Sequence, residues 1–147
     1  MNELVNRVIE LAVQIQQIPA PTFEEKKRAE FVCALFAQEG LAEVSMDGAG
    51  NVYGCWKAEA ASAKPLIVSA HLDTVFPAST DLTVNRSSGQ IHGPGLGDNS
   101  LGVAALFGLL WMLRDRRIEP AGDIWFVANT CEEGLGNLRG MKAIVDR

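Results

Sequence analysis

Two continuous apolar runs, residues 66–70 and 123–128, constrain the fold of this chain most. Each run has the length of a strand and lacks polar alternation, which is typical of a strand covered on both faces. Residues 99–117 lie between them and are apolar nearly all round at helical spacing, so we expect this helix at the centre of the fold. Helices that alternate with buried strands predict an α/β fold, with helices layered on a mainly parallel, mixed sheet.

The N-terminal region predicts two helices. Apolar residues at helical spacing indicate an amphipathic helix over residues 2–17, which ends before Pro19. Thr22 and Glu25 have the spacing of a capping box, in which the two side chains satisfy backbone N–H groups at the start of a helix. A second helix is therefore expected from this point to about residue 39.

The remaining segments predict two hairpins and a last helix. The glycine-rich residues 47–50 join two short strands expected at residues 42–46 and 52–57. Residues 82–92 have the pattern of a surface hairpin, and a further helix is expected from residue 137 onward.

The composition favours one folded domain without affinity for nucleic acids. The chain has 147 residues, of which 48% are hydrophobic, and this suffices for the core of a single domain. Its net charge of −5 disfavours binding to phosphate backbones, which requires a clustered basic surface. We interpret the short basic runs at residues 26–28 and 114–117 as solvated helix faces.

The cysteines and the apolar segments indicate a cytoplasmic protein. Cys33, Cys55 and Cys131 are odd in number and widely spaced, which favours free thiols in a reducing compartment. The N-terminus lacks the basic and apolar regions of a signal peptide. The longest apolar stretch, residues 101–113, is shorter than the roughly 20 residues that span a bilayer, so no membrane partner is expected.

A histidine and several carboxylates follow the predicted buried strands. His71 comes directly after the first strand, and Glu132 and Glu133 follow the second. Asp98 precedes the central helix, which must run back antiparallel to a strand, so all three segments are expected at the edge where α/β proteins place their sites. These are the ligand types of hydrolytic zinc sites. Asp73 is placed to accept the second ring N–H of His71 and so to orient that ring.

Other readings of these residues remain open. His92 and Cys131 are interpreted as a loop residue and a small core residue rather than as ligands. The acidic pair alone would suit the positive end of the next helix. The glycine-rich residues 134–140 follow a strand, but their spacing departs from the dinucleotide-binding fingerprint and the adjacent carboxylates would repel a pyrophosphate, which leaves a nucleotide site as an alternative.

The three motifs together resemble those of a known family. An HxD motif after a strand (residues 71–73), GDN at the start of a helix (residues 97–99) and EEG after the next strand (residues 132–134) resemble the dinuclear-zinc exopeptidases and deacylases. That family includes acetylornithine deacetylase, succinyl-diaminopimelate desuccinylase, carboxypeptidase G, aminoacylase and peptidase T. Residues 19–25 resemble the segment that joins the first two helices of the family.

The resemblance implies a role for each site residue. His71 would bind one zinc ion, Asp98 would bridge two, and Glu133 would bind the other. Glu132 would be the general base that takes a proton from the bridging water, and Asp73 would orient His71. The complete site would contain two Zn²⁺ ions, with Co or Mn as alternatives, and the Asp98–Asn99 peptide bond is expected to be cis.

The resemblance also implies elements that this sequence does not supply. The family has another carboxylate ligand after the acidic pair, a histidine ligand near its C-terminus, and an inserted lid or dimerisation domain. We therefore interpret residues 1–147 as the N-terminal part of a catalytic domain, truncated before the sheet is completed. The expected function is hydrolysis of a peptide or an N-acyl amino acid, with this chain alone inactive, weak in zinc binding and prone to form homo-oligomers. The alternative is a non-catalytic α/β module that keeps the motifs without a complete site.

Overall fold

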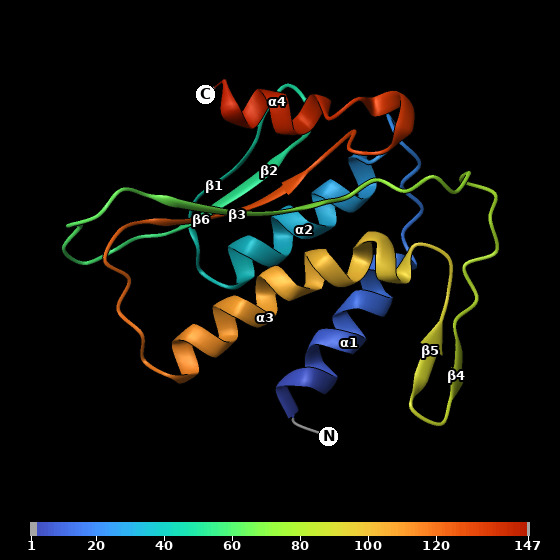
Figure 1. The fold of residues 1–147 in the computed structure, drawn as a ribbon, viewed down its shortest axis with the longest axis horizontal. Helices are drawn as coiled ribbons and strands as arrows, with labels where there is room; N and C mark the ends of the chain where they lie inside the picture. Colours follow the sequence, from blue (N-terminus) through green and yellow to red (C-terminus); the bar gives the residue numbers. More distant parts are fainter. Residues whose placement is uncertain (1–2, 147) are drawn as a thin grey trace.

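A computed structural model describes residues 3–146 of the chain. Two helices precede a hairpin, and the later strands are separated by a central helix (Figure 1). In chain order the elements are α1 (Glu3–Gln16), α2 (Lys26–Gln38), β1 (Ala42–Met46), β2 (Val52–Trp56), β3 (Leu66–His71), β4 (Asn85–Ser87), β5 (Gln90–His92), a turn at Leu96–Ser100, α3 (Leu101–Asp115), β6 (Ile124–Asn129), a 3₁₀ turn at Gly134–Gly136 and α4 (Arg139–Val145).

The main sheet has the strand order β1-β2-β6-β3. Strands β3 and β6 are parallel, whereas β2 is antiparallel to both β1 and β6. The predicted α/β fold with a mixed sheet is confirmed, with one correction: the parallel pairing is limited to β3 and β6. The reason is that β1 and β2 form a tight hairpin, and this hairpin joins the sheet through β2.

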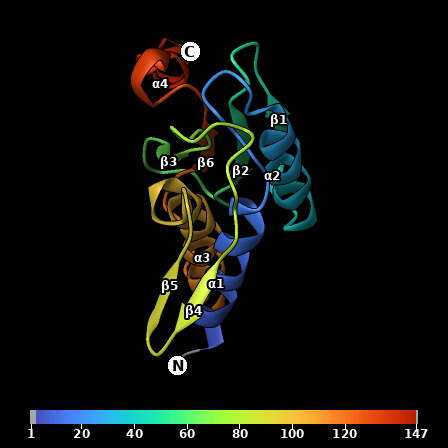
Figure 2. The same cartoon turned by 90° about the vertical axis from the view of Figure 1, so that its right-hand side faces the viewer.

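Helices cover the two faces of the sheet unequally. Figures 1 and 2 show α1, α2 and α3 on one face and the short helix α4 on the other. Alternation along β6 follows this arrangement, because Phe126 packs in the core under the three long helices whereas Val127 packs with Tyr53 and Ile144 on the α4 side. The main core therefore lies between the sheet and the first three helices.

The apolar run of β3 predicts a strand covered on both faces, and this prediction is wrong. It lies at an edge of the sheet, and Leu66 and Ile67 are 57% and 51% exposed. Ala70, near the carboxyl end of the strand, is buried. An apolar run indicates that both faces of a strand can be buried. Whether they are buried depends on which helices and strands pack against it.

The second helix begins later than predicted. Helix α2 starts at Lys26, and no side chain caps its N-terminal N–H groups. The capping box predicted for Thr22 and Glu25 is therefore wrong. Both side chains instead bond to distant segments of the chain, Thr22 to Asp73 and Glu25 to the N–H of Cys131.

The central helix packs as a core element. Together with the preceding turn it spans 20 residues, within which a window of 18 residues has a mean hydropathy of 1.4, so by length and composition it would be able to cross a membrane. In this fold Val103, Leu106 and Leu110 are buried in the main core. Core helices pass the same test of length and composition, and helix α3 contacts α1 and β3.

Candidate metal centre

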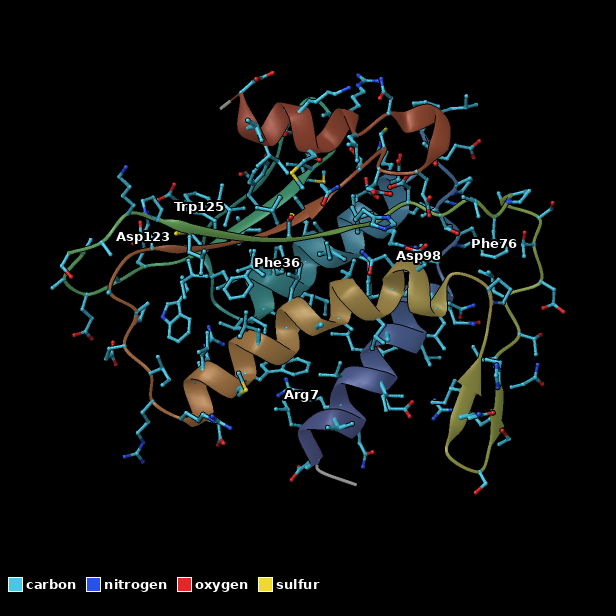
Figure 3. All side chains as sticks on the ribbon, in the orientation of Figure 1. Arg7, Phe36, Phe76, Asp98, Asp123 and Trp125 are labelled. Carbon is cyan, nitrogen blue, oxygen red and sulfur yellow. The ribbon has the colours of Figure 1, made fainter. Side chains whose placement is uncertain are left out.

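The parallel pair β3–β6 brings the candidate ligands to one edge of the sheet. Its register pairs His71 with Asn129, so the chain leaves both strands at the same level. Glu132 and Glu133 follow β6 within a few residues, and Asp98 lies in the turn before α3, at the same end of the molecule (Figure 3). The Asp98–Asn99 peptide bond is cis, as the family resemblance implies.

His71, Asp98 and Glu133 form a compact group of possible ligands. One ligand atom from each residue lies within 4.8 Å of the other two. The Nε2 atom of His71 is 3.1 Å from Oδ1 of Asp98 and 3.8 Å from Oε2 of Glu132. One imidazole nitrogen with two carboxylate oxygens is a donor set that zinc and similar divalent ions accept, so the residues present fit a metal ion.

The charges in this group favour a cation. Burial and the negative charge of Asp98 raise the pKa of Glu133. Burial alone would lower the pKa of His71, but the neighbouring carboxylates of Asp73 and Glu132 more than offset this effect and raise it. Within residues 3–146, no lysine or arginine forms an ion pair with Asp98, Glu132 or Glu133. A divalent cation would relieve the repulsion among these carboxylates.

Asp73 contacts the ring of His71 through its backbone and its side chain. Nδ1 of His71 lies 3.1 Å from the backbone carbonyl oxygen of Asp73 and 3.5 Å from its carboxylate. A carbonyl oxygen only accepts, so Nδ1 donates in this contact, and Nε2 is the ring nitrogen that faces Asp98 and would be available to a metal ion. Both the backbone carbonyl and the carboxylate of Asp73 therefore lie beside Nδ1 of His71.

The carboxylate of Asp73 organises the acidic loop. It is fully buried and accepts the N–H groups of Glu132 and Glu133 and the hydroxyl of Thr22, at 2.9–3.0 Å. Burial would raise the pKa of Asp73, but these hydrogen bonds and the contact with His71 hold it at about 2. Asp73 therefore remains ionised and keeps the acidic pair beside His71.

Four consecutive backbone N–H groups of the acidic loop donate to side chains from distant parts of the chain. All four N···O distances lie between 2.9 and 3.0 Å, and they join Thr130 to Asn51, Cys131 to Glu25, and both Glu132 and Glu133 to Asp73. Because every N–H in this stretch has a fixed acceptor, the backbone that presents the acidic pair is preorganised.

Arg28 is a supporting residue that the sequence analysis misses. It is 2% exposed, so the interpretation of residues 26–28 as a solvated face is wrong for this side chain. Its guanidinium donates to the carbonyl of Leu72 at 2.7 Å and to that of Ile18 at 2.6 and 2.9 Å. Burial lowers the pKa of Arg28 to about 10, against the opposing effect of the Asp73 charge.

A signal for Arg28 exists in the sequence. It precedes Val32 by one helical repeat and Phe36 by two, so it lies on the stripe of α2 that faces the core. Together, Thr22, Glu25 and Arg28 contact the two loops that carry the motifs, at residues 72–73 and at residue 131. The patterns of Thr22 and Glu25 carry no comparable signal, because capping residues have the same identities.

His92 and Cys131 do not belong to the ligand group. His92 is exposed in β5, where its ring lies beside Gln90. Cys131 is buried, and burial raises the pKa of its thiol. Both placements agree with the non-ligand interpretation of these residues.

Comparison with known proteins identifies the family. The sequence profile of peptidase family M28 matches residues 51–146, which include all the candidate ligands. The chain belongs to this family. This M28 match agrees with the resemblance to zinc exopeptidases that the motifs indicate, and a comparison with curated proteins gives no significant match.

Solved structures share the fold. The aminopeptidase PepT from Bacillus cereus is 27% identical over 94% of this chain and 39% of its own, with a TM-score of 0.79. A tripeptidase from Staphylococcus aureus is 24% identical over 95% of this chain and 40% of its own, with a TM-score of 0.74. The YxeP protein of Bacillus subtilis, described as a dinuclear metal binding peptidase of the M20 family, is 15% identical over 95% of this chain and 40% of its own, with a TM-score of 0.64.

The chain spans about two fifths of the length of these solved structures. The profile match over residues 51–146 covers β3, α3 and β6, the elements that position the candidate ligands. The likeness thus extends to the part of the fold that positions the ligands.

Proposed function

We propose that this chain is part of a metal-dependent hydrolase that cleaves a peptide or an N-acyl amide bond. The observation that supports this most directly is the convergence of His71, Asp98 and Glu133 within 4.8 Å at the carboxyl edge of the sheet. Membership in a peptidase family and the peptidases among the solved structures of the same fold give further support.

Each site residue has a distinct role in this proposal. His71, Asp98 and Glu133 would hold the metal, and Asp98 would be a ligand common to both ions of a complete site. A divalent ion such as Zn²⁺, or Co or Mn in its place, lowers the pKa of a water molecule and polarises a carbonyl. Glu132 accepts the proton of the attacking water and passes it to the leaving amine. Asp73 holds the ring of His71 and the backbone of the acidic pair in position.

The geometry of Glu132 suits a proton acceptor. Its carboxylate lies 3.8 Å from Nε2 of His71, and its side chain is 38% exposed, so it borders the ligand group and can reach water. Asp73 accepts the N–H of Glu133 as well, so one buried carboxylate fixes the backbone of both acidic residues.

The ligand count limits what residues 3–146 do alone. They bring together three ligands, whereas zinc ions in proteins usually have three or four protein ligands each. We infer that a site for two ions takes further ligands from outside these residues. The 147-residue chain is then expected to bind zinc weakly and to hydrolyse no dipeptide.

Calorimetry with Zn²⁺ tests this inference, with His71→Ala as the control for binding at the site. Weak binding that His71→Ala removes is the expected result. Sub-micromolar binding of two zinc ions, or peptide hydrolysis by the chain alone at an ordinary rate, would contradict the ligand count.

The function itself is tested with a form of the protein extended beyond residue 147 to the length of its solved relatives. Zinc-dependent release of amino acids from a panel of dipeptides and N-acyl amino acids is expected. An extended form that binds no zinc and hydrolyses neither class would instead favour a non-catalytic module.

Self-association is a further expected property, and it follows from the edge of the sheet. Strand β3 exposes Leu66 and Ile67 beside unpaired backbone groups, and such edges pair with other chains. We expect light scattering after size exclusion to give a mass above 15.9 kDa at micromolar concentration. Ile67→Lys should shift the protein toward the monomer, whereas Ser88→Lys in the β4–β5 turn should not. If the unsubstituted chain were monomeric, this expectation would be refuted.

A further inference from the structure

Exposed apolar side chains gather beside the metal group. Phe23, Val75 and Leu135 are 56%, 66% and 91% exposed, and they lie on three separate segments of the chain. These segments enclose a pocket of about 350 Å³, lined by Pro21, Thr22, Phe23, Thr74, Val75, Pro77, Glu133, Gly134 and Leu135. Glu133 belongs to both the pocket and the ligand group, so the pocket opens next to the metal site.

The walls of this pocket are tied to one another. The carboxylate Oδ2 of Asp73 accepts both the Thr22 hydroxyl at 2.9 Å and the Glu133 N–H at 3.0 Å. The N–H of Thr74 donates to the carbonyl of Ala20 at 3.0 Å, which joins the segment at residues 74–77 to the segment at residues 21–23. The pocket is therefore largely preformed, as binding sites for small ligands usually are.

The backbone at Phe23 supports a functional reading of the pocket. Phe23 has φ = +77°, in the left-handed region that bulky residues rarely adopt. This conformation is unfavourable for a phenylalanine, yet the ring remains more than half exposed and gains little from burial. Backbone strain of this kind is concentrated at ligand-binding sites.

Phe76 extends the apolar surface beyond the pocket. It is 37% exposed and lies on the segment that leaves β3, at the same end of the molecule as Asp98 (Figure 3). Single exposed apolar residues are ordinary on a protein surface, but a cluster around a polar centre indicates a binding site.

We propose that this pocket binds an apolar side chain of the substrate, next to the bond that is cleaved. This proposal rests on the proposed function, because Glu133 belongs both to the ligand group and to the lining of the pocket. Glu133 is the one charged residue among those that line the pocket, and metal binding occupies it. The remaining lining is apolar or hydroxyl-bearing, so aliphatic and aromatic side chains fit better than charged ones.

The test compares leucine hydroxamic acid with glycine hydroxamic acid as ligands of the zinc-loaded chain. Both carry the same metal-binding group, so their difference in affinity reports the pocket alone. We expect leucine hydroxamic acid to bind about 10-fold more tightly or better, as hydrophobic pockets discriminate by this order. Val75→Ser and Leu135→Ser should remove most of the preference, whereas Leu138→Ser, at an exposed leucine outside the pocket, should retain it.

A second measurement separates the pocket from the metal site. Methyl signals of Val75 and Leu135 are followed by NMR in the metal-free chain during titration with N-acetyl-leucine amide and N-acetyl-glycine amide. Saturable shifts with the leucine compound alone support the pocket even if zinc binding fails and the proposed function falls. Equal affinities of the two hydroxamic acids, or methyl shifts that do not distinguish the two amides, would overturn the pocket and leave the proposed metal site standing.

Discussion

In the extended form of the protein, Glu132→Gln is expected to leave the metal content unchanged and to lower kcat by about 100-fold or more, as the loss of a general base does. The amide has nearly the size of the carboxylate but cannot accept a proton from water. Its backbone N–H still donates to Asp73, so the loop should keep its shape. Measurement of kcat on a dipeptide, with metal content determined by mass spectrometry after dialysis, gives both quantities.

Glu133→Gln is the matched variant on the same loop, and its expected result is the opposite one. Glu133 belongs to the ligand group, so its loss should weaken zinc binding beyond the roughly 10- to 100-fold typical of supporting residues. Zinc titration of the chain measures this effect even without hydrolysis. If Glu132→Gln lost the metal and Glu133→Gln kept it, the assignment within the acidic pair would have to be exchanged.

Arg28→Met is expected to lower the free energy of unfolding by about 3–5 kcal/mol, the range for removing one member of a buried charged network. The change leaves the carbonyls of Ile18 and Leu72 without their donor in the protein interior. It also removes a positive charge that interacts with the buried carboxylate of Asp73. Urea denaturation of the metal-free chain measures the difference.

Lys27→Met on the same helix is the control for this change. Lys27 is exposed, and surface substitutions usually alter the unfolding free energy by less than about 0.5 kcal/mol. Arg28→Lys should recover part of the loss, because one ammonium group cannot reproduce the forked contact with two carbonyls. Equal stability of Arg28→Met and Lys27→Met would show that the hydrogen bonds of Arg28 contribute nothing net.

Much of the site could be predicted because it depends on rules that act along the chain. Apolar runs and helical spacing predict β3, β6 and α3 near their observed bounds. Parallel strands end at the same edge of a sheet, so His71 and the acidic pair had to approach each other once that pairing was expected. The position of Asp98 before the central helix follows from the same argument.

The supporting residues could not be predicted in this way. Thr22 and Glu25 have the identities of capping residues, and their true acceptor and donor, Asp73 and Cys131, lie far away in the sequence. The local pattern suggests that these side chains bond to nearby backbone N–H groups. The carboxylate of Asp73 and the N–H of Cys131 are buried, where a hydrogen bond left unmade is costly, so these distant contacts form instead.

The candidate ligands and the edge of the sheet at which they meet could be predicted from the sequence. Three features depend on the packing of distant segments: β3 lies at an exposed edge, the buried carboxylate of Asp73 holds the acidic loop, and Arg28 donates to the carbonyls of Ile18 and Leu72. The physical reason is range. Periodicity and strand polarity act between near neighbours in sequence, whereas burial and the satisfaction of buried polar groups depend on every segment that packs nearby.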